Sequence, residues 1–240
     1  MSKRRLFNSS ILFDKFQEIP NRRSFFPNSQ TRVLDKVHIA LYNYRTNVCE
    51  LYLRRDEMIE DLVYAIKSRS GFGPKSNKWK HWKATLDLKT CYECRTIHGK
   101  IFSINETVSP MPPLHWCCRC EITPMNAYNA EECTKQGING APCWIKTYGQ
   151  LPEYYITGEA LQALGWRWGK APSKYAPGTM PTMGVYRNED GHLPVATGRI
   201  WYEADINYTS GRRNSQRVVW SNDGLIFVTY DHYQTFIEVV

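Results

Sequence analysis

Five of the eight cysteines fall between residues 91 and 120, and this clustering restricts the folds open to the chain more than any other feature. The other three are Cys49, Cys133 and Cys143, and no cysteine follows them. A disulfide framework would spread its cysteines more evenly through a small secreted chain. Short spacers within one segment favour a metal site instead.

The spacing of these cysteines predicts structural zinc. Cys91-Tyr-Glu-Cys94 is followed after twenty-three residues by Cys118-Arg-Cys120. Zinc takes four sulfur or nitrogen ligands in a tetrahedron, and four protein ligands leave no open position for catalysis. Because the second pair has a tighter spacer than usual, His115 is an alternative ligand in place of one of its cysteines. Free thiols without a metal remain the other interpretation.

Positive charge is concentrated in the part of the chain that contains these cysteines. Residues 1–135 hold 22 Lys and Arg against 14 Asp and Glu, whereas residues 136–240 hold nine of each. The surplus favours an anionic partner, nucleic acid above all. The mean hydropathy is −0.51, and no apolar run approaches the length of a membrane span. We therefore expect no membrane partner, and the first residues lack the features of a secretory signal.

Local patterns divide the 240 residues into four parts. Residues 1–30 mix basic residues, Asn, Pro and Phe without a period and are expected to form a flexible arm. Residues 31–126 form a module that begins with helical periodicity and continues with short strands around the cysteines. Turn residues predict a linker over 127–137, and residues 138–240 form the last domain.

The last domain has the signals of short helices followed by antiparallel strands. Thr157 can cap a helix that Gly165 ends. Asn222-Asp223-Gly224 separates two apolar runs and predicts a hairpin, and residues 235–240 predict a further strand. The expected class is therefore α+β: a helical and small-β module stapled by zinc, then short helices packed on an antiparallel sheet.

A basic and aromatic segment precedes the cysteines. Six cationic side chains interleave there with aromatic residues: Lys67, Arg69, Phe72, Lys75, Lys78, Trp79, Lys80, Trp82 and Lys83. Cations and stacking surfaces together suit a nucleic-acid strand. The interpretation that we favour is that both tryptophans pack in the module and that the lysines form a solvated face.

The cysteine segment resembles the phage head-morphogenesis family, the minor head proteins similar to the F protein of phage Mu. The shared elements occur in the family's order: Trp82-Lys-Ala-Thr85, Asp87, Thr90-Cys-Tyr-Glu-Cys94, Ile97-His-Gly99, Ile101-Phe102, Pro112-Pro-Leu-His115 and Cys118-Arg-Cys120. The resemblance covers roughly residues 32–124, and Trp116-Cys117 departs from the family's pattern. It implies association with a capsid or portal, and packaged DNA as a further partner.

Four side chains of the last domain could catalyse RNA transesterification: Glu203, Arg213, Arg217 and His232. This reaction needs a base for the 2′-hydroxyl proton, an acid for the leaving 5′-oxygen, and cations that stabilise the charged phosphorane. One carboxylate, two guanidiniums and one imidazole supply these roles. By themselves such residues are common in strands and loops.

The surrounding segments resemble the barnase family of guanyl-preferring microbial ribonucleases. The similarity runs from about residue 138 to the end, through segments that agree in order and spacing: Leu151-Pro152, Tyr155-Ile-Thr157, Ala163-Leu-Gly-Trp166, Ala176-Pro-Gly178, Gly191, Leu193-Pro194, Trp201–Arg217 and Asp231–Phe236. The resemblance implies a ribonuclease domain whose catalysis uses no metal.

The resemblance also implies roles for individual residues. Glu203 is the general base and His232 the general acid, while Arg213 and Arg217 bind the phosphate. Further roles follow by position: Asp205 orients the arginines or forms a purely structural ion pair, and Tyr233 can contact substrate. Tyr186-Arg-Asn-Glu-Asp190 is the loop that binds guanine. In that loop Asp190 accepts from the base, and Asn188 stabilises the loop.

Two positions of the last domain bear on its activity. The family's phosphate-side lysine is Gly158 here, so we expect a slower nuclease. The family's glutamate in the guanine loop is the shorter Asp190. Gly149 stands where the first helix ends and can close it in the left-handed conformation.

Together these features predict a two-part phage protein. It would cleave single-stranded RNA to a 2′,3′-cyclic phosphate with a preference for guanine, and act as a toxin or effector carried on a minor head module. An acidic inhibitor resembling barstar is an expected partner, because the arginines are clustered. The virion or the bacterial cytoplasm is the expected location. The alternative is a structural head protein whose ribonuclease-like domain is weakened or inactive.

Overall fold

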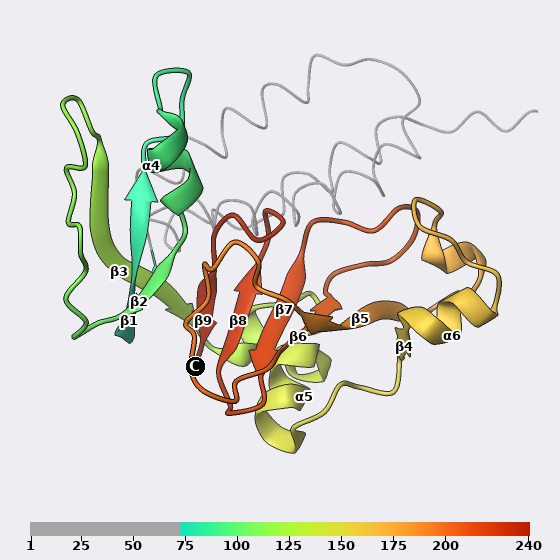
Figure 1. The fold of residues 1–240 in the computed structure, drawn as a ribbon. Helices are drawn as coiled ribbons and strands as arrows, with labels where there is room; N and C mark the ends of the chain where they lie inside the picture. Colours follow the sequence, from blue (N-terminus) through green and yellow to red (C-terminus); the bar gives the residue numbers. More distant parts are fainter. Residues whose placement is uncertain (1–72) are drawn as a thin grey trace, which may run out of the picture. The chain divides into compact units, whose positions relative to one another are not determined.

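A computed structural model describes residues 73–240 of the chain (Figure 1). The expected arm over 1–30, the helical periodicity of 32–66 and the first residues of the basic segment lie outside the described residues. Within 73–240 the fold is α+β, as expected, with a large sheet and few helices. No helix in this range is long and apolar enough to cross a membrane.

The described residues form nine strands, three α-helices and three 3-10 helices. The strands are β1 (Lys75–Ala84), β2 (Ile101–Ser103), β3 (Cys120–Tyr128), β4 (Tyr155–Thr157), β5 (Met180–Tyr186), β6 (Trp201–Asp205), β7 (Arg217–Ser221), β8 (Ile226–Thr229) and β9 (Ile237–Val239). The α-helices are α4 (Tyr92–Ile97), α5 (Ala141–Tyr148) and α6 (Gly158–Ala163); the 3-10 helices are η2 (Ala130–Glu132), η3 (Gly137–Asn139) and η4 (Pro172–Lys174).

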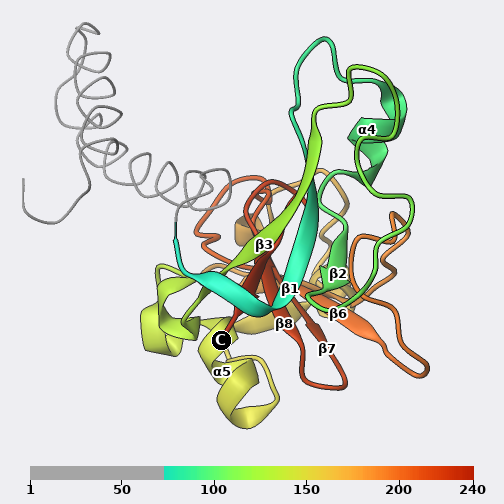
Figure 2. The ribbon, with the colours of Figure 1, turned by 90° about the vertical axis from the view of Figure 1, so that its left-hand side faces the viewer.

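All the strands belong to one sheet of nine strands, in the order β2-β1-β3-β9-β8-β7-β6-β5-β4. The segment that contains the cysteines supplies β2, β1 and β3, and the last domain supplies the rest. The two groups join where β3 pairs in parallel with β9, with Ala127 opposite Glu238 and Tyr128 opposite Val239. Figure 2 shows β3 meeting the C-terminal strands at this seam.

The central strands bury different side chains on their two faces because side chains alternate along a strand. Val218 and Val228 face a core that α5 covers with Ala141 and Ile145. The neighbouring Val219 and Phe227 face a second core with Trp201, Leu193 and Phe236. Ile101 and Met125, from β2 and β3, complete this second core.

The expected helix ends and turns of the last domain are present. Thr157 caps α6 by accepting from the Ala160 amide at 3.1 Å. Gly149 ends α5 at φ 70°, the left-handed conformation that glycine adopts without strain. The Asn222–Gly224 turn joins β7 to β8, which pair in antiparallel fashion.

The N-terminal module has a small core of its own. Trp82 is fully buried and packs with Phe102 and Val108. Trp79 packs against Phe227 of the second core, with ring centroids 6.0 Å apart. Both tryptophans therefore contribute to packing, as we favoured over a nucleic-acid surface. The cysteine segment differs from expectation in one respect: short strands were expected around the cysteines, but Tyr92–Ile97 forms a helix.

Residues 127–137, where the sequence predicts a linker, include regular structure. They continue β3 through Tyr128 and then form η2. Ala130 and Cys133 are buried in the core beneath α5. Turn-forming residues gave the linker expectation, but packing against the sheet orders this segment.

Candidate active site

One face of β6 and β7 carries three of the predicted site residues. Glu203 and Asp205 are two residues apart and so project to the same side of β6. Arg217 lies directly opposite Asp205 on the neighbouring strand. All three are buried, with Asp205 completely so. Alternation and register thus place two carboxylates and a guanidinium together.

Asp205 holds both arginines. Its carboxylate accepts from Arg213 Nε at 2.8 Å and from Arg213 Nη2 at 2.5 Å. Its Oδ1 also lies 3.0 Å from Arg217 Nε. Arg213 Nη2 lies 3.8 Å from Glu203 Oε1, so the cluster continues to the predicted base. Pairing offsets the free-energy cost of burying these charges. The shared carboxylate also keeps the two guanidiniums close together.

A loop between β8 and β9 carries His232 and Tyr233. Both residues have positive φ, 58° and 67°, which non-glycine residues rarely adopt. Asp231 stabilises this conformation by accepting from the amide and hydroxyl of Thr235, at 2.9 and 2.6 Å. The Thr229 hydroxyl accepts from the Tyr233 amide at 3.0 Å. The loop is therefore fixed by side chains within it.

Tyr233 links the predicted base to the predicted acid. Its hydroxyl donates to Glu203 Oε2, and its ring makes an edge contact with the exposed His232, with centroids 4.9 Å apart. Burial and the charge of Glu203 raise the pKa of Tyr233, so the phenol stays protonated and donates. Glu203 and His232 thus both contact one aromatic side chain.

The expected guanine loop follows β5. The Asn188 side chain closes it, donating to the Leu193 carbonyl and accepting from the Leu193 amide, both at 3.0 Å. Asp190 is exposed at the tip. Tyr186, at the end of β5, stacks on Tyr233 with ring centroids 4.8 Å apart. This stacking places the guanine loop beside the catalytic loop.

Gly158, which stands where the family has a lysine, packs close to Met183. Gly158 begins α6, and a Cβ added to it would lie 2.9 Å from Met183 Sδ. The thioether therefore occupies part of the space that a side chain would need. Because the contact is with the flexible end of methionine, a longer residue at 158 requires only a local shift.

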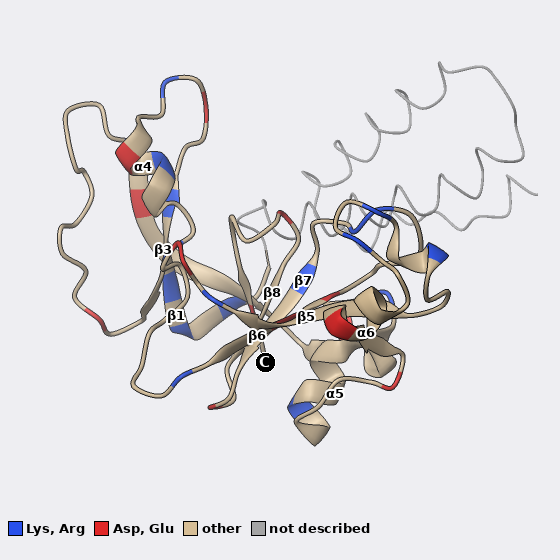
Figure 3. Ribbon diagram, turned by 45° about the vertical axis from the view of Figure 1, so that its right-hand side comes forward, with Lys and Arg blue, Asp and Glu red and all other residues tan. Residues whose placement is uncertain are grey.

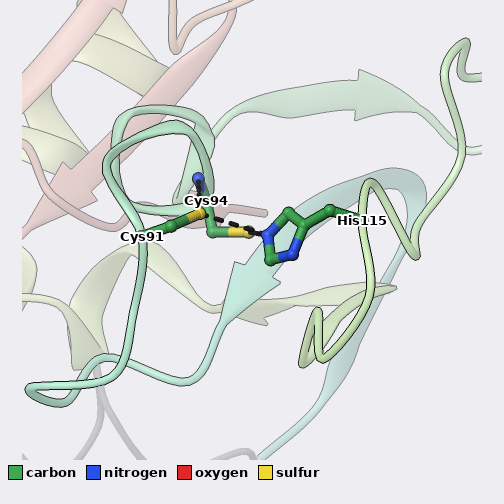
Figure 4. Close-up of side chains that lie close together, drawn as sticks. All are labelled: Cys91, Cys94 and His115. Carbon is green, nitrogen blue, oxygen red and sulfur yellow. Dashed lines mark hydrogen bonds between the residues drawn. The ribbon is translucent and has the colours of Figure 1, made fainter.

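The cysteines and His115 also come together (Figure 4). His115 Nε2 lies 3.2 Å from Sγ of both Cys91 and Cys94, and Cys94 Sγ lies 3.7 Å from Cys118 Sγ. Cys120 joins a second group with Cys94 and Cys118. Cys94 belongs to both groups, and so the five donors form one cluster. The exposed Cys117 is in neither group.

The donor set of this cluster fits zinc. His115 Nδ1 lies 2.8 Å from the Trp116 carbonyl, which orients the ring so that Nε2 faces the sulfurs. Four of the five donors are sufficient for a tetrahedral site. The geometry is compatible with the four cysteines that we expected and equally with His115 in place of one.

Two contacts near the site were not foreseen from the sequence. The Arg213 guanidinium lies 5.8 Å from the ring centroid of Trp168, a cation–π arrangement. The buried His192 lies next to the guanine loop and contacts Tyr233. In the sequence, this contact was indicated only by the position of His192 directly after Gly191. Figure 3 shows a basic position on β7, and Arg217 is the one Lys or Arg of that strand.

Comparison with known proteins matches the two parts in the expected order. Residues 55–123 match the family described as Phage Mu protein F like protein, and residues 140–240 match the ribonuclease family. A ribonuclease from Heyndrickxia coagulans is 45% identical over 103 residues, 42% of this chain and 94% of that protein. Ribonucleases of Bacillus intermedius and Bacillus pumilus are also 45% identical over 103 residues, which cover 64% of their length. Both resemblances are thereby confirmed.

Proposed function

The chain belongs to the ribonuclease family and is a ribonuclease, and from this premise we propose that it cleaves single-stranded RNA by transesterification without a catalytic metal. The observation that carries the proposal is that Tyr233 contacts both Glu203 and His232, beside two arginines paired with Asp205. This set contains a base, an acid and cations within one site.

The reaction follows from the chemistry of these groups. The Glu203 carboxylate takes the proton of the ribose 2′-hydroxyl, and the 2′-oxygen attacks the phosphorus. His232 gives a proton to the departing 5′-oxygen, leaving a 2′,3′-cyclic phosphate and a 5′-hydroxyl. Arg213 and Arg217 stabilise the negative charge of the phosphorane, and their fixed positions avoid reorganisation during the step.

The guanine loop would select the base. Backbone amides of residues 186–190 would donate to the guanine oxygen, and the exposed Asp190 would accept from the base N–H groups. The stacked Tyr186 and Tyr233 offer an aromatic surface at the same place. Asp190 is shorter than glutamate, so we propose a preference for guanine that depends on this carboxylate.

The matched test is cleavage of a guanosine-containing dinucleotide by the full chain without added divalent metal. Glu203→Gln and His232→Gln should each reduce kcat by about 10² to 10⁴ because acid–base catalysis is lost. Asp223→Asn, an exposed position remote from the proposed chemistry, should cleave like the wild type. Inert wild-type protein, or variants as active as wild type, would refute this function.

The N-terminal module provides the second part of the proposal. It would hold structural zinc through four of its five donors and attach the chain to a phage capsid or portal, beside packaged DNA. Delivered in this way, the ribonuclease would act as a toxin or effector, and its producer would need an acidic inhibitor resembling barstar. Co-expression tests that need: harmless expression of the active chain without a second protein contradicts it.

One observation favours the weakened-enzyme alternative. The place of the phosphate-side lysine is taken by Gly158 packed near Met183. We propose that this loss slows the enzyme without abolishing catalysis, because the base, the acid and both arginines are present.

A further inference from the structure

His192 connects three segments that are distant in sequence. Its ring Nε2 lies 3.2 Å from the carbonyl oxygen of Thr96, near the end of α4. Its Nδ1 lies 3.3 Å from the carbonyl oxygen of Tyr233, in the catalytic loop. Its own carbonyl accepts from the Ile101 amide, at the start of β2, at 2.8 Å. This buried side chain thus lies between the N-terminal module and the proposed ribonuclease site.

A second contact joins the same segments. Gly99 lies in the turn between α4 and β2 at φ 88°, which favours glycine. A Cβ at this position would overlap the carbonyl oxygen of Gln234, the residue after Tyr233. The turn therefore lies directly against the backbone of the catalytic loop, at a distance that only glycine permits.

The two loops held here are those that carry the proposed chemistry. The catalytic loop presents His232 and Tyr233 in left-handed conformations, which are costly for side chains of this size. The guanine loop is closed by Asn188 on Leu193, which directly follows His192 and is buried in one core with Ile101 and Met125. Residues of the N-terminal module thus contact both the guanine loop and the catalytic loop.

We propose that His192 is a positioning residue, through which the segment 96–101 of the N-terminal module holds the guanine loop and the catalytic loop in register. The expected change in kcat rests on the proposed ribonuclease function. The expected change in the order of the two loops does not. RNA cleavage by this chain then depends on contacts from outside the ribonuclease domain. The imidazole acts by hydrogen bonding to the backbone, so a side chain that keeps a donor should replace it in part.

The kinetic test uses the full chain with two substitutions at one position. His192→Phe keeps a ring but removes the imidazole N–H and should lower kcat by about 10- to 100-fold, because misplaced catalytic groups lose proximity. His192→Gln keeps an N–H donor and should restore most of that loss. Thr96→Ala is the matched control, since it leaves the Thr96 carbonyl in place. Equal kcat in the Phe variant and the wild type would overturn the proposal.

Hydrogen exchange separates this inference from the ribonuclease proposal, because it needs no activity. In His192→Phe the amides of residues 188–193 and 230–236 should exchange faster than in the wild type, while those of β7 and β8 should not change. Faster exchange throughout β7 and β8 would indicate general destabilisation and overturn a positioning role. If wild-type protein does not cleave RNA, the proposed function fails, and the exchange pattern still decides the role of His192.

Discussion

The N-terminal module and the ribonuclease domain share one sheet but are stabilised by different means. Within residues 73–126 the module's own core contains three buried side chains, Trp82, Phe102 and Val108, and five donors that could hold a metal ion lie together. The core that includes α5 contains twelve buried residues, ten of them from the ribonuclease domain, and this domain pairs the buried Asp205 with Arg213 and Arg217. A small core needs an additional staple, whereas a larger core can hold strained loops and buried charges. The predictions below test this division.

The largest expected effect is on the module. Cys94 belongs to both donor groups, so Cys94→Ala should abolish metal binding and expose β1–β3 to solvent, because zinc contributes about 10 kcal/mol to folding in small zinc modules. Zinc content and hydrogen exchange measure this, and β6–β8 should remain protected. Cys117→Ala is the control and should keep both the metal and the fold. If β1–β3 remain protected from hydrogen exchange in metal-free Cys94→Ala protein, the metal does not stabilise the module.

The paired charges of the ribonuclease domain come next. Asp205→Asn leaves Arg213 and Arg217 without their shared carboxylate, and we expect the free energy of unfolding to fall by about 3 to 5 kcal/mol. Urea denaturation followed on the ribonuclease strands measures the loss. Asp223→Asn breaks an exposed pair with Arg199 and should cost less than about 1 kcal/mol. If both variants lose the same free energy of unfolding, burial of the Asp205 cluster does not add to its stabilising effect.

A gain of activity is expected at Gly158. Gly158→Lys would add a cation at the start of α6 and should raise kcat/KM by about 10- to 100-fold through stabilisation of the transition state. Gly158→Gln has a similar length without the charge and should give no comparable gain. Initial rates on one dinucleotide compare the two. If Gly158→Gln is as fast as Gly158→Lys, a positive charge at position 158 does not explain the gain.

The smallest effect is a pH dependence of the module. Burial, with the nearby charges of His98, Lys83 and Lys75, lowers the pKa of His81 to about 4. The unfolded chain then binds a proton that the folded chain does not between pH 6.5 and 4, so stability falls as the pH is lowered through this window. We expect a loss of about 1 to 2 kcal/mol, which His81→Gln removes. Denaturation at pH 7 and pH 4.5 measures it, and an equal loss in both proteins would contradict this role.

The sequence predicted those features that depend on neighbouring residues. The cap at Thr157, the glycine end at Gly149 and the turn before β8 each follow from residues within a few positions. The clustering of Glu203 and Asp205 follows from alternation along a strand. The cysteine and histidine cluster was also predictable from its short spacers.

The remaining features depend on contacts between distant segments. The parallel seam of β3 and β9 pairs residues more than a hundred positions apart, and no local pattern indicates it. The order of residues 127–137 follows from packing beneath the sheet rather than from their turn-forming composition. The contact of His192 with Thr96 spans 96 positions and only appears once both parts are folded.

The central claim is that Glu203 and His232 act as base and acid across one phosphodiester. Phosphorus NMR of a guanosine dinucleotide during cleavage tests it most directly, because the mechanism requires a 2′,3′-cyclic phosphate. The wild type should accumulate the cyclic product and a free 5′-hydroxyl at the same rate with or without added magnesium. A linear phosphate formed without a cyclic intermediate, or cleavage that requires added metal, would contradict the account.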